Sequence, residues 1–121
     1  MATVELNRDN FEDVVTKNPF VVVDFWAPWC GPCRSFAPVY EAASEKNPDV
    51  VFAKVNTEVE QELAGHFQIR SIPTLMLFRD QVIIYSQPGS MPANQFDLLI
   101  AKARELDMDE VRRQIAEQQK A

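Results

Sequence analysis

This 121-residue chain has little of what several kinds of protein need. Two cysteines are too few for a disulfide-rich secreted scaffold. Twelve basic residues stand against eighteen acidic ones, and the net charge of −6 repels nucleic acid phosphates and anionic lipids. No apolar run reaches the ~20 residues that a membrane helix requires. The first residues, MATVELNRDNFED, lack the basic and apolar blocks of a signal peptide. We therefore expect a cytoplasmic protein that binds neither nucleic acid nor membranes.

The composition is that of one ordinary globular domain, with 46% hydrophobic and 25% charged residues. A chain of this length buries ~65% of its unfolded surface and needs no disulfides or metals to stabilise its core. The apolar segment PFVVVDFW, residues 19–26, predicts a strand buried on both faces. Further strands are predicted at 3–6, at 50–56 and twice within 74–87, where two adjacent runs indicate an antiparallel hairpin.

Helical spacing of apolar residues fills the gaps between these strands, at 7–18, 34–47, 58–67 and 93–107. The order β-α-β-α-β-α-β-β-α predicts an α/β fold with one mixed five-stranded sheet and helices on both faces. After it, Asp107 and Glu110 have the spacing of a capping box. We expect a domain at 1–105 and a short helical extension, not a second domain, at 106–121.

The two cysteines, Cys30 and Cys33, lie in WAPWCGPC and allow three interpretations. A structural disulfide would close a four-residue loop and contribute roughly 2 kcal/mol. A zinc site needs three or four ligands, and the lone His66 lies in another predicted helix. The third interpretation, a redox reagent, is the one that the local sequence favours.

The pair follows a buried strand and precedes a helix, which places Cys30 at the helix N-terminus. Unpaired N–H groups and the helix dipole there should lower the pKa of the Cys30 thiol and increase its nucleophilic thiolate form. Cys33 lies one turn inside the helix, where we expect it to be less exposed and able to displace whatever Cys30 captures. Pro32 is tolerated in the first helical turn.

The segment VVDFWAPWCGPC resembles the active-site segment of the thioredoxin family. Independent pieces recur in the family's order: Asp24 in the strand, the Cys-Gly-Pro-Cys sequence, Pro38 in the following helix and IRSIPTLMLF at 69–78. The likeness covers residues 3 to about 105 and implies the thioredoxin fold.

The resemblance also implies catalytic roles. Cys30 corresponds to the attacking thiolate and Cys33 to the resolving thiol. Asp24 corresponds to a buried acid that assists proton transfer to and from Cys33, and burial should raise its pKa. Lys54 corresponds to a lysine near that acid. From the residues alone, Asp24 could also lie at a frayed strand end and Lys54 could be an ordinary surface lysine.

Substrate contacts follow from the same resemblance. It implies a cis Ile72–Pro73 bond facing the sulfurs, with the Ile72 backbone pairing with an extended substrate. The implied contact residues are Trp29, Gly31, Pro32, Ile72, Pro73 and Gly89. Three departures stand out: Pro88 precedes Gly89 in place of a small β-branched residue, the hairpin turn RDQ lacks a glycine, and the extension has no family counterpart.

The function implied is that of a protein-disulfide reductase acting through Cys30 and Cys33, in electron transport and cell redox homeostasis. Thioredoxin reductase, using NADPH, would restore the dithiol, and no bound cofactor or metal is needed. The partners would be the reductase and disulfide-containing proteins, and we expect a monomer. Two alternatives are a docking subunit of a larger complex and an oxidant or isomerase of secreted proteins.

Overall fold

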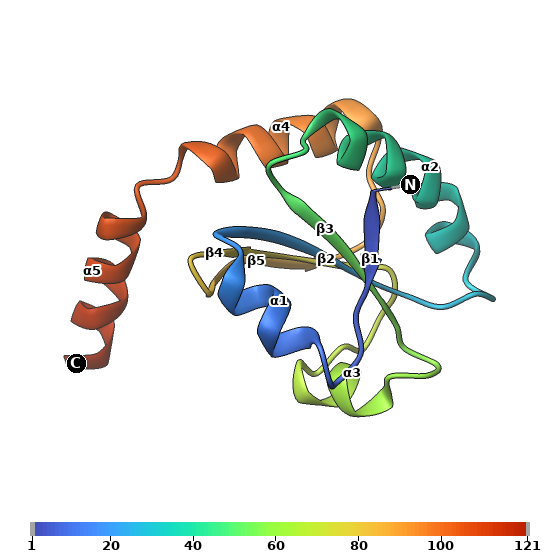
Figure 1. Cartoon of the computed structure of the whole chain (residues 1–121), viewed down its shortest axis with the longest axis horizontal. Coiled ribbons are helices and arrows are strands. Elements are labelled where there is room, and N and C mark those ends of the chain that lie inside the picture. The colour runs from blue at the N-terminus through green and yellow to red at the C-terminus, as the bar shows by residue number, and fades with distance from the viewer. Residues whose placement is uncertain (1, 121) are drawn as a thin grey trace.

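Five strands form one mixed sheet in the computed structural model, which describes residues 2–120. The elements are β1 (Thr3–Glu5), α1 (Phe11–Lys17), β2 (Phe20–Trp26), α2 (Gly31–Lys46), β3 (Val51–Asn56), α3 (Gln61–His66), β4 (Thr74–Arg79), β5 (Val82–Pro88), α4 (Ala93–Glu105) and α5 (Met108–Lys120). The strand order is β1-β3-β2-β4-β5 (Figure 1). β1, β3 and β2 are parallel, β4 is antiparallel to β2, and β5 is antiparallel to β4. The predicted element order and mixed sheet are confirmed.

β2 is the centre of the sheet, and its side chains enter two cores. Val21 and Val23 pack with α1 and α3 on one face, whereas Val22 packs with α2 and α4 on the other. In Figure 1, α2 and α4 lie above the sheet and α1 and α3 below it. This double burial explains why β2 reads as a continuous apolar run rather than an alternating one.

The core under α2 and α4 contains a cluster of aromatic rings. Phe36, Tyr40 and Phe96 make ring contacts with centroids 5.2–5.8 Å apart, and Phe52 of β3 joins them. Tyr40 is fully buried, and its hydroxyl lies 3.0 Å from the Val22 carbonyl oxygen and 2.6 Å from that of Ala53. The core therefore anchors the middle of α2 over the centre of the sheet.

The β4–β5 hairpin turns without glycine, as its sequence predicted. Asp80 and Gln81 both adopt the left-handed backbone, with φ of 49° and 70°. Two such residues are what a tight two-residue hairpin demands, although glycine or asparagine usually supplies them. A bulge in β5 leaves Ile84 as the extra residue opposite Leu77 and Phe78.

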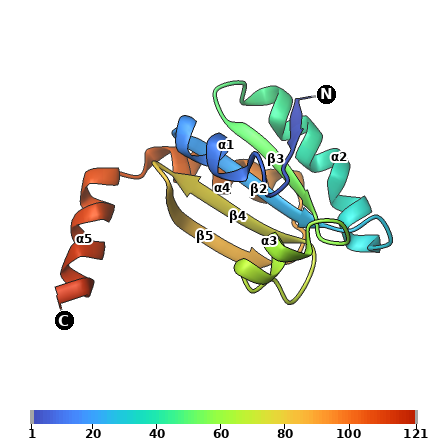
Figure 2. The ribbon, with the colours of Figure 1, turned by 60° about the horizontal axis from the view of Figure 1, so that its bottom comes forward.

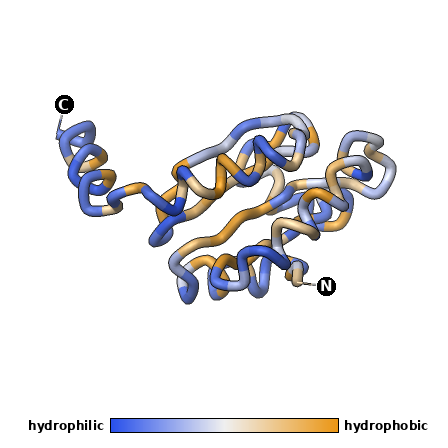
Figure 3. Tube along the Cα trace, turned by 90° about the horizontal axis from the view of Figure 1, so that it is seen from above, coloured by the Kyte–Doolittle hydropathy of each residue, from blue (hydrophilic) through white to orange (hydrophobic). Residues whose placement is uncertain are grey.

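The predicted C-terminal helix is present as α5, which projects from the body beyond α4 (Figures 1 and 2). Asp107 accepts hydrogen bonds from the backbone N–H groups of Asp109 and Glu110, which confirms its capping role. Met108 is buried and Arg112 pairs with Asp80 of the hairpin turn. Most of α5 is hydrophilic (Figure 3). Over residues 2–120, every helix is too short or too polar to cross a bilayer.

Candidate active site

The two cysteines form a disulfide at the start of α2, with their Cα atoms 5.2 Å apart. Cys30 is the N-cap of the helix, and the backbone N–H of Cys33 donates to its Sγ at 3.2 Å. This contact is the anion-stabilising arrangement that the sequence predicted for residue 30. The expected difference in exposure is wrong: both residues are 4% exposed, because the disulfide holds both sulfurs against the same apolar neighbours.

Those neighbours come from the ends of β2 and the loop before β4. Ala27 is fully buried, and Trp26 and Ile72 pack against the sulfurs. The Ile72–Pro73 bond is cis, as the resemblance implied. The Cys30 Sγ lies 3.7 Å from the Ile72 carbonyl oxygen. The Ile72 backbone therefore lies directly beside the Cys30 sulfur.

Asp24 lies inside the molecule on β2 and is 1% exposed. The alternative of a frayed strand end is therefore excluded. Burial raises the pKa of Asp24 from 3.8 to about 7, and the Lys54 ammonium opposes part of this rise. Among the residues that the structure describes, none forms a hydrogen bond with its Oδ1. A buried carboxyl with this pKa can accept and release a proton near neutral pH.

Lys54 is opposite Asp24 in the register of β2 and β3. Its side chain is half-buried, and its Nζ lies 4.5 Å from the centre of the Trp26 ring. This position lets a positive charge act on Asp24 without a direct salt bridge. The structure thus places Lys54 at the acid rather than on the open surface.

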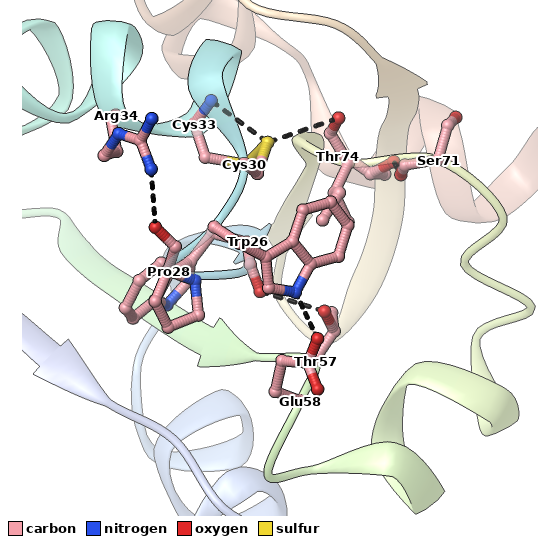
Figure 4. The surroundings of a disulfide bond; sticks show 11 residues. Trp26, Pro28, Cys30, Cys33, Arg34, Thr57, Glu58, Ser71 and Thr74 are labelled. Carbon is pink, nitrogen blue, oxygen red and sulfur yellow. Dashed lines mark hydrogen bonds between the residues drawn. A yellow bond between two sulfur atoms is a disulfide. The ribbon is translucent and has the colours of Figure 1, made fainter.

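Three contacts hold the loop that leads into Cys30, and the sequence did not reveal them. The Arg34 guanidinium donates to the Pro28 carbonyl oxygen at 3.0 Å (Figure 4). The exposed Trp29 indole donates to the Glu58 carboxylate. The Thr57 hydroxyl donates to the carbonyl oxygen of Trp26 at 3.0 Å. These partners come from separate segments, so spacing along the chain gives no signal for them.

Gly89 lies beside the cis bond, with its backbone N–H donating to the Pro73 carbonyl oxygen at 2.8 Å. Its φ of 103° favours glycine. Pro88 is the last residue of the edge strand β5, opposite Thr74. Because Gly89 is bonded to β4, the alternating ladder turns the nitrogen of residue 88 away from β4. Proline therefore costs no ladder hydrogen bond and removes a donor from the outer edge.

The remaining implied contact residues lie around the sulfurs or in the active-site loop. Gly31 and Pro32 are exposed in the first turn of α2, and Trp29 is 64% exposed. His66 is on the surface against Phe67, far along the chain from the cysteines. Within residues 2–120, no cluster of three potential metal-ligating side chains occurs.

A cysteine pair at the start of a helix, a cis-proline beside it and a buried acid on the central strand of a mixed sheet define a thiol–disulfide oxidoreductase of thioredoxin fold. Solved structures agree. A thioredoxin mutant from Halobacterium salinarum has a TM-score of 0.80 at 32% identity, covering 87% of this chain and 93% of that one. A Plasmodium falciparum thioredoxin has a TM-score of 0.77 at 30% identity, covering 83% and 98%.

The chain belongs to the thioredoxin family, whose family model matches residues 2–102. A putative thioredoxin 2 of Streptomyces coelicolor is 58% identical over 118 residues, which are 98% of this chain and 88% of that protein. A protein disulfide-isomerase of Triticum aestivum is 46% identical over 84 residues, but this chain covers only 16% of it.

These matches revise the expectation about the C-terminal extension. The family model stops at residue 102, before α5 begins. The Streptomyces match, however, spans 98% of this chain and so includes most of residues 106–121. The extension therefore has a counterpart in at least one relative.

Proposed function

We propose that this oxidoreductase reduces disulfides in protein substrates, with Cys30 as the nucleophile. The observation that carries the proposal is the position of the Cys30 sulfur, which caps α2 beside the Ile72 backbone. The Cys30 thiolate attacks one sulfur of the substrate disulfide. A mixed disulfide forms, and the other substrate sulfur leaves as a thiolate.

The second step resolves the mixed disulfide. The Cys33 thiol gives its proton to the Asp24 carboxylate, and the resulting thiolate attacks the Cys30 sulfur. The Cys30–Cys33 disulfide forms and the remaining substrate sulfur leaves reduced, so two electrons pass from the dithiol to the substrate. Lys54 favours the ionised form of Asp24 and so helps it to accept the proton.

Substrate binding is assigned to the exposed residues around the cysteines and to the loop that contains the cis-proline. The Ile72 backbone would pair with an extended substrate segment, and Gly89 leaves space beside it. Pro73, Trp29, Gly31 and Pro32 complete the contact surface.

We further infer that the dithiol is restored by a thioredoxin reductase that uses NADPH, in the cytoplasm. The chain itself would need no bound cofactor and would act as a monomer in cell redox homeostasis. The Gly-Pro pair between the cysteines supports a reductant rather than an oxidant or isomerase, which favours a histidine there.

Insulin reduction coupled to NADPH oxidation by thioredoxin reductase tests the reaction. We expect turnover by the wild type and none by Cys30→Ser, because that variant lacks the nucleophile. Equal turnover by Cys30→Ser would exclude the mechanism.

A trapping experiment separates an enzyme from a docking subunit. Cys33→Ser should accumulate mixed disulfides with many proteins, because the resolving thiol is missing. A docking subunit would instead retain one partner even when both cysteines are changed to serine.

A further inference from the structure

An apolar groove follows the outer side of the molecule between α4 and β5. Two adjoining hollows of about 140 and 250 Å³ share Tyr85, Leu99 and Lys102 in their linings and so form one groove. Met91 lines one end and Leu106 the other. The groove thus extends along the whole length of α4.

The groove exposes apolar side chains to solvent. Leu98 of α4 is 55% exposed, and Leu106, the residue that follows the helix, is 40% exposed. Lys102 is the charged residue of the lining, and it forms no ion pair with any residue from 2 to 120. Exposed leucines in a groove that also carries an ammonium group without an ion pair are typical of a surface that a partner covers.

One end of the groove, at Met91, lies close along the chain to the active site. Met91 lies two residues after Gly89, whose N–H bonds to Pro73 next to the Cys30 sulfur. A protein attached to Cys30 through a disulfide therefore has its neighbouring residues at the mouth of the groove. Contacts made there, remote from the reacting sulfurs, can increase the rate of reaction with proteins but not with small disulfides.

We propose that this groove is a docking site for protein substrates. It takes an apolar segment adjacent to the substrate cysteine, with a carboxylate of that segment facing Lys102. The proposal rests on the proposed function, because the groove acts only on substrates that react at Cys30.

The test compares a protein disulfide with a small neutral one. Reduced protein is mixed with insulin or with bis(2-hydroxyethyl) disulfide, and the second-order rate constant is measured for each. Leu98→Asp should lower the insulin rate about tenfold, which is what the loss of one leucine contact predicts. Lys102→Glu should lower it about threefold, as for an exposed ion pair. Both variants should react with the small disulfide at the wild-type rate, which also shows that they fold.

Ala101→Asp is the matched control, because it adds the same charge to the side of α4 that faces away from the groove. It should leave both rates unchanged. Unchanged insulin rates in Leu98→Asp, or equal loss with both disulfides, would overturn the docking site.

Two other occupants of the groove are also tested. A wild-type dimer that Leu98→Asp dissociates in sedimentation would assign the groove to a second copy. An increase in the insulin rate after removal of residues 107–121 would assign it to α5. Either result overturns the proposal. Failure of the wild type to react with either disulfide would refute the proposed function itself, and the docking site with it.

Discussion

The buried carboxyl group of Asp24 links the stability of the protein to pH. Its pKa is about 7 in the folded chain and 3.8 when unperturbed, because burial disfavours the charge. At a pH between these two pKa values, Asp24 has lost its proton in the unfolded chain but keeps it in the folded chain. Stability therefore falls as pH rises from about 4 to 7 and is constant above, by about 4 kcal/mol in all.

Asp24→Asn removes this loss. We expect the variant to be more stable than the wild type by a few kcal/mol at pH 8, and the advantage to shrink towards pH 4. Urea unfolding of the disulfide form at pH 4.5, 6 and 8 measures it. An advantage that is the same at every pH would show that the carboxyl does not titrate in this range.

The charge of Lys54 offsets part of the effect of burial on the pKa of Asp24. Because this ammonium lowers the pKa of Asp24 against the effect of burial, Lys54→Met should raise that pKa further. The rate at which the Cys30 mixed disulfide is resolved should then reach its plateau at a higher pH than in the wild type. Stopped-flow measurement of the resolution rate between pH 6 and 9 gives the pH at which this rate is half of its plateau value, the midpoint.

Lys46→Met is the control for the loss of one positive charge, since Lys46 pairs with Asp97 on the surface. It should leave the midpoint where it is in the wild type. A downward displacement in Lys54→Met would contradict the role assigned to Lys54.

Among the elements, the turn of the β4–β5 hairpin has a strained backbone at Gln81, and a substitution can relieve this strain. Gln81 has a φ of 70°, which costs a residue with a side chain about 1 kcal/mol and glycine almost nothing. Gln81→Gly should therefore increase the free energy of unfolding by about 0.5–1 kcal/mol. The midpoint of urea unfolding measures this.

Gln87→Gly provides the comparison, because Gln87 lies within the extended strand β5. Glycine there should destabilise, since it gains freedom in the unfolded chain without relieving strain. A loss of stability in both variants would mean that the turn is not strained.

Some features of the helices and strands could be predicted from the sequence and others could not. The strand at 20–26, the position of Cys30 at the N-terminus of a helix and the cap at Asp107 were predictable, because each depends on neighbours in the chain. The contacts at the end of α4 were not predictable. Arg79 of β4 donates hydrogen bonds to the carbonyl oxygens of Ala103 and Arg104 there. Contacts such as this, and that of Trp29 with Glu58, depend on the folded arrangement of distant segments.

For the molecule as a whole, the redox site and the C-terminal extension lie at opposite ends. Figures 1 and 2 show α5 at one end of the molecule and the start of α2 at the other. The main ties of α5 to the body are the buried Met108 and the pair of Arg112 with Asp80. Each core and the disulfide are complete without it.

A chain that ends at Leu106 should therefore fold and react with bis(2-hydroxyethyl) disulfide at the wild-type rate. Its free energy of unfolding should fall by about 1–2 kcal/mol, because it loses the burial of one methionine and an exposed ion pair. Urea unfolding and the reaction rate test the division at residue 105 directly. A truncated chain that unfolds without a cooperative transition would show that α5 is an integral part of the domain, since only a helix that completes the core could abolish cooperativity.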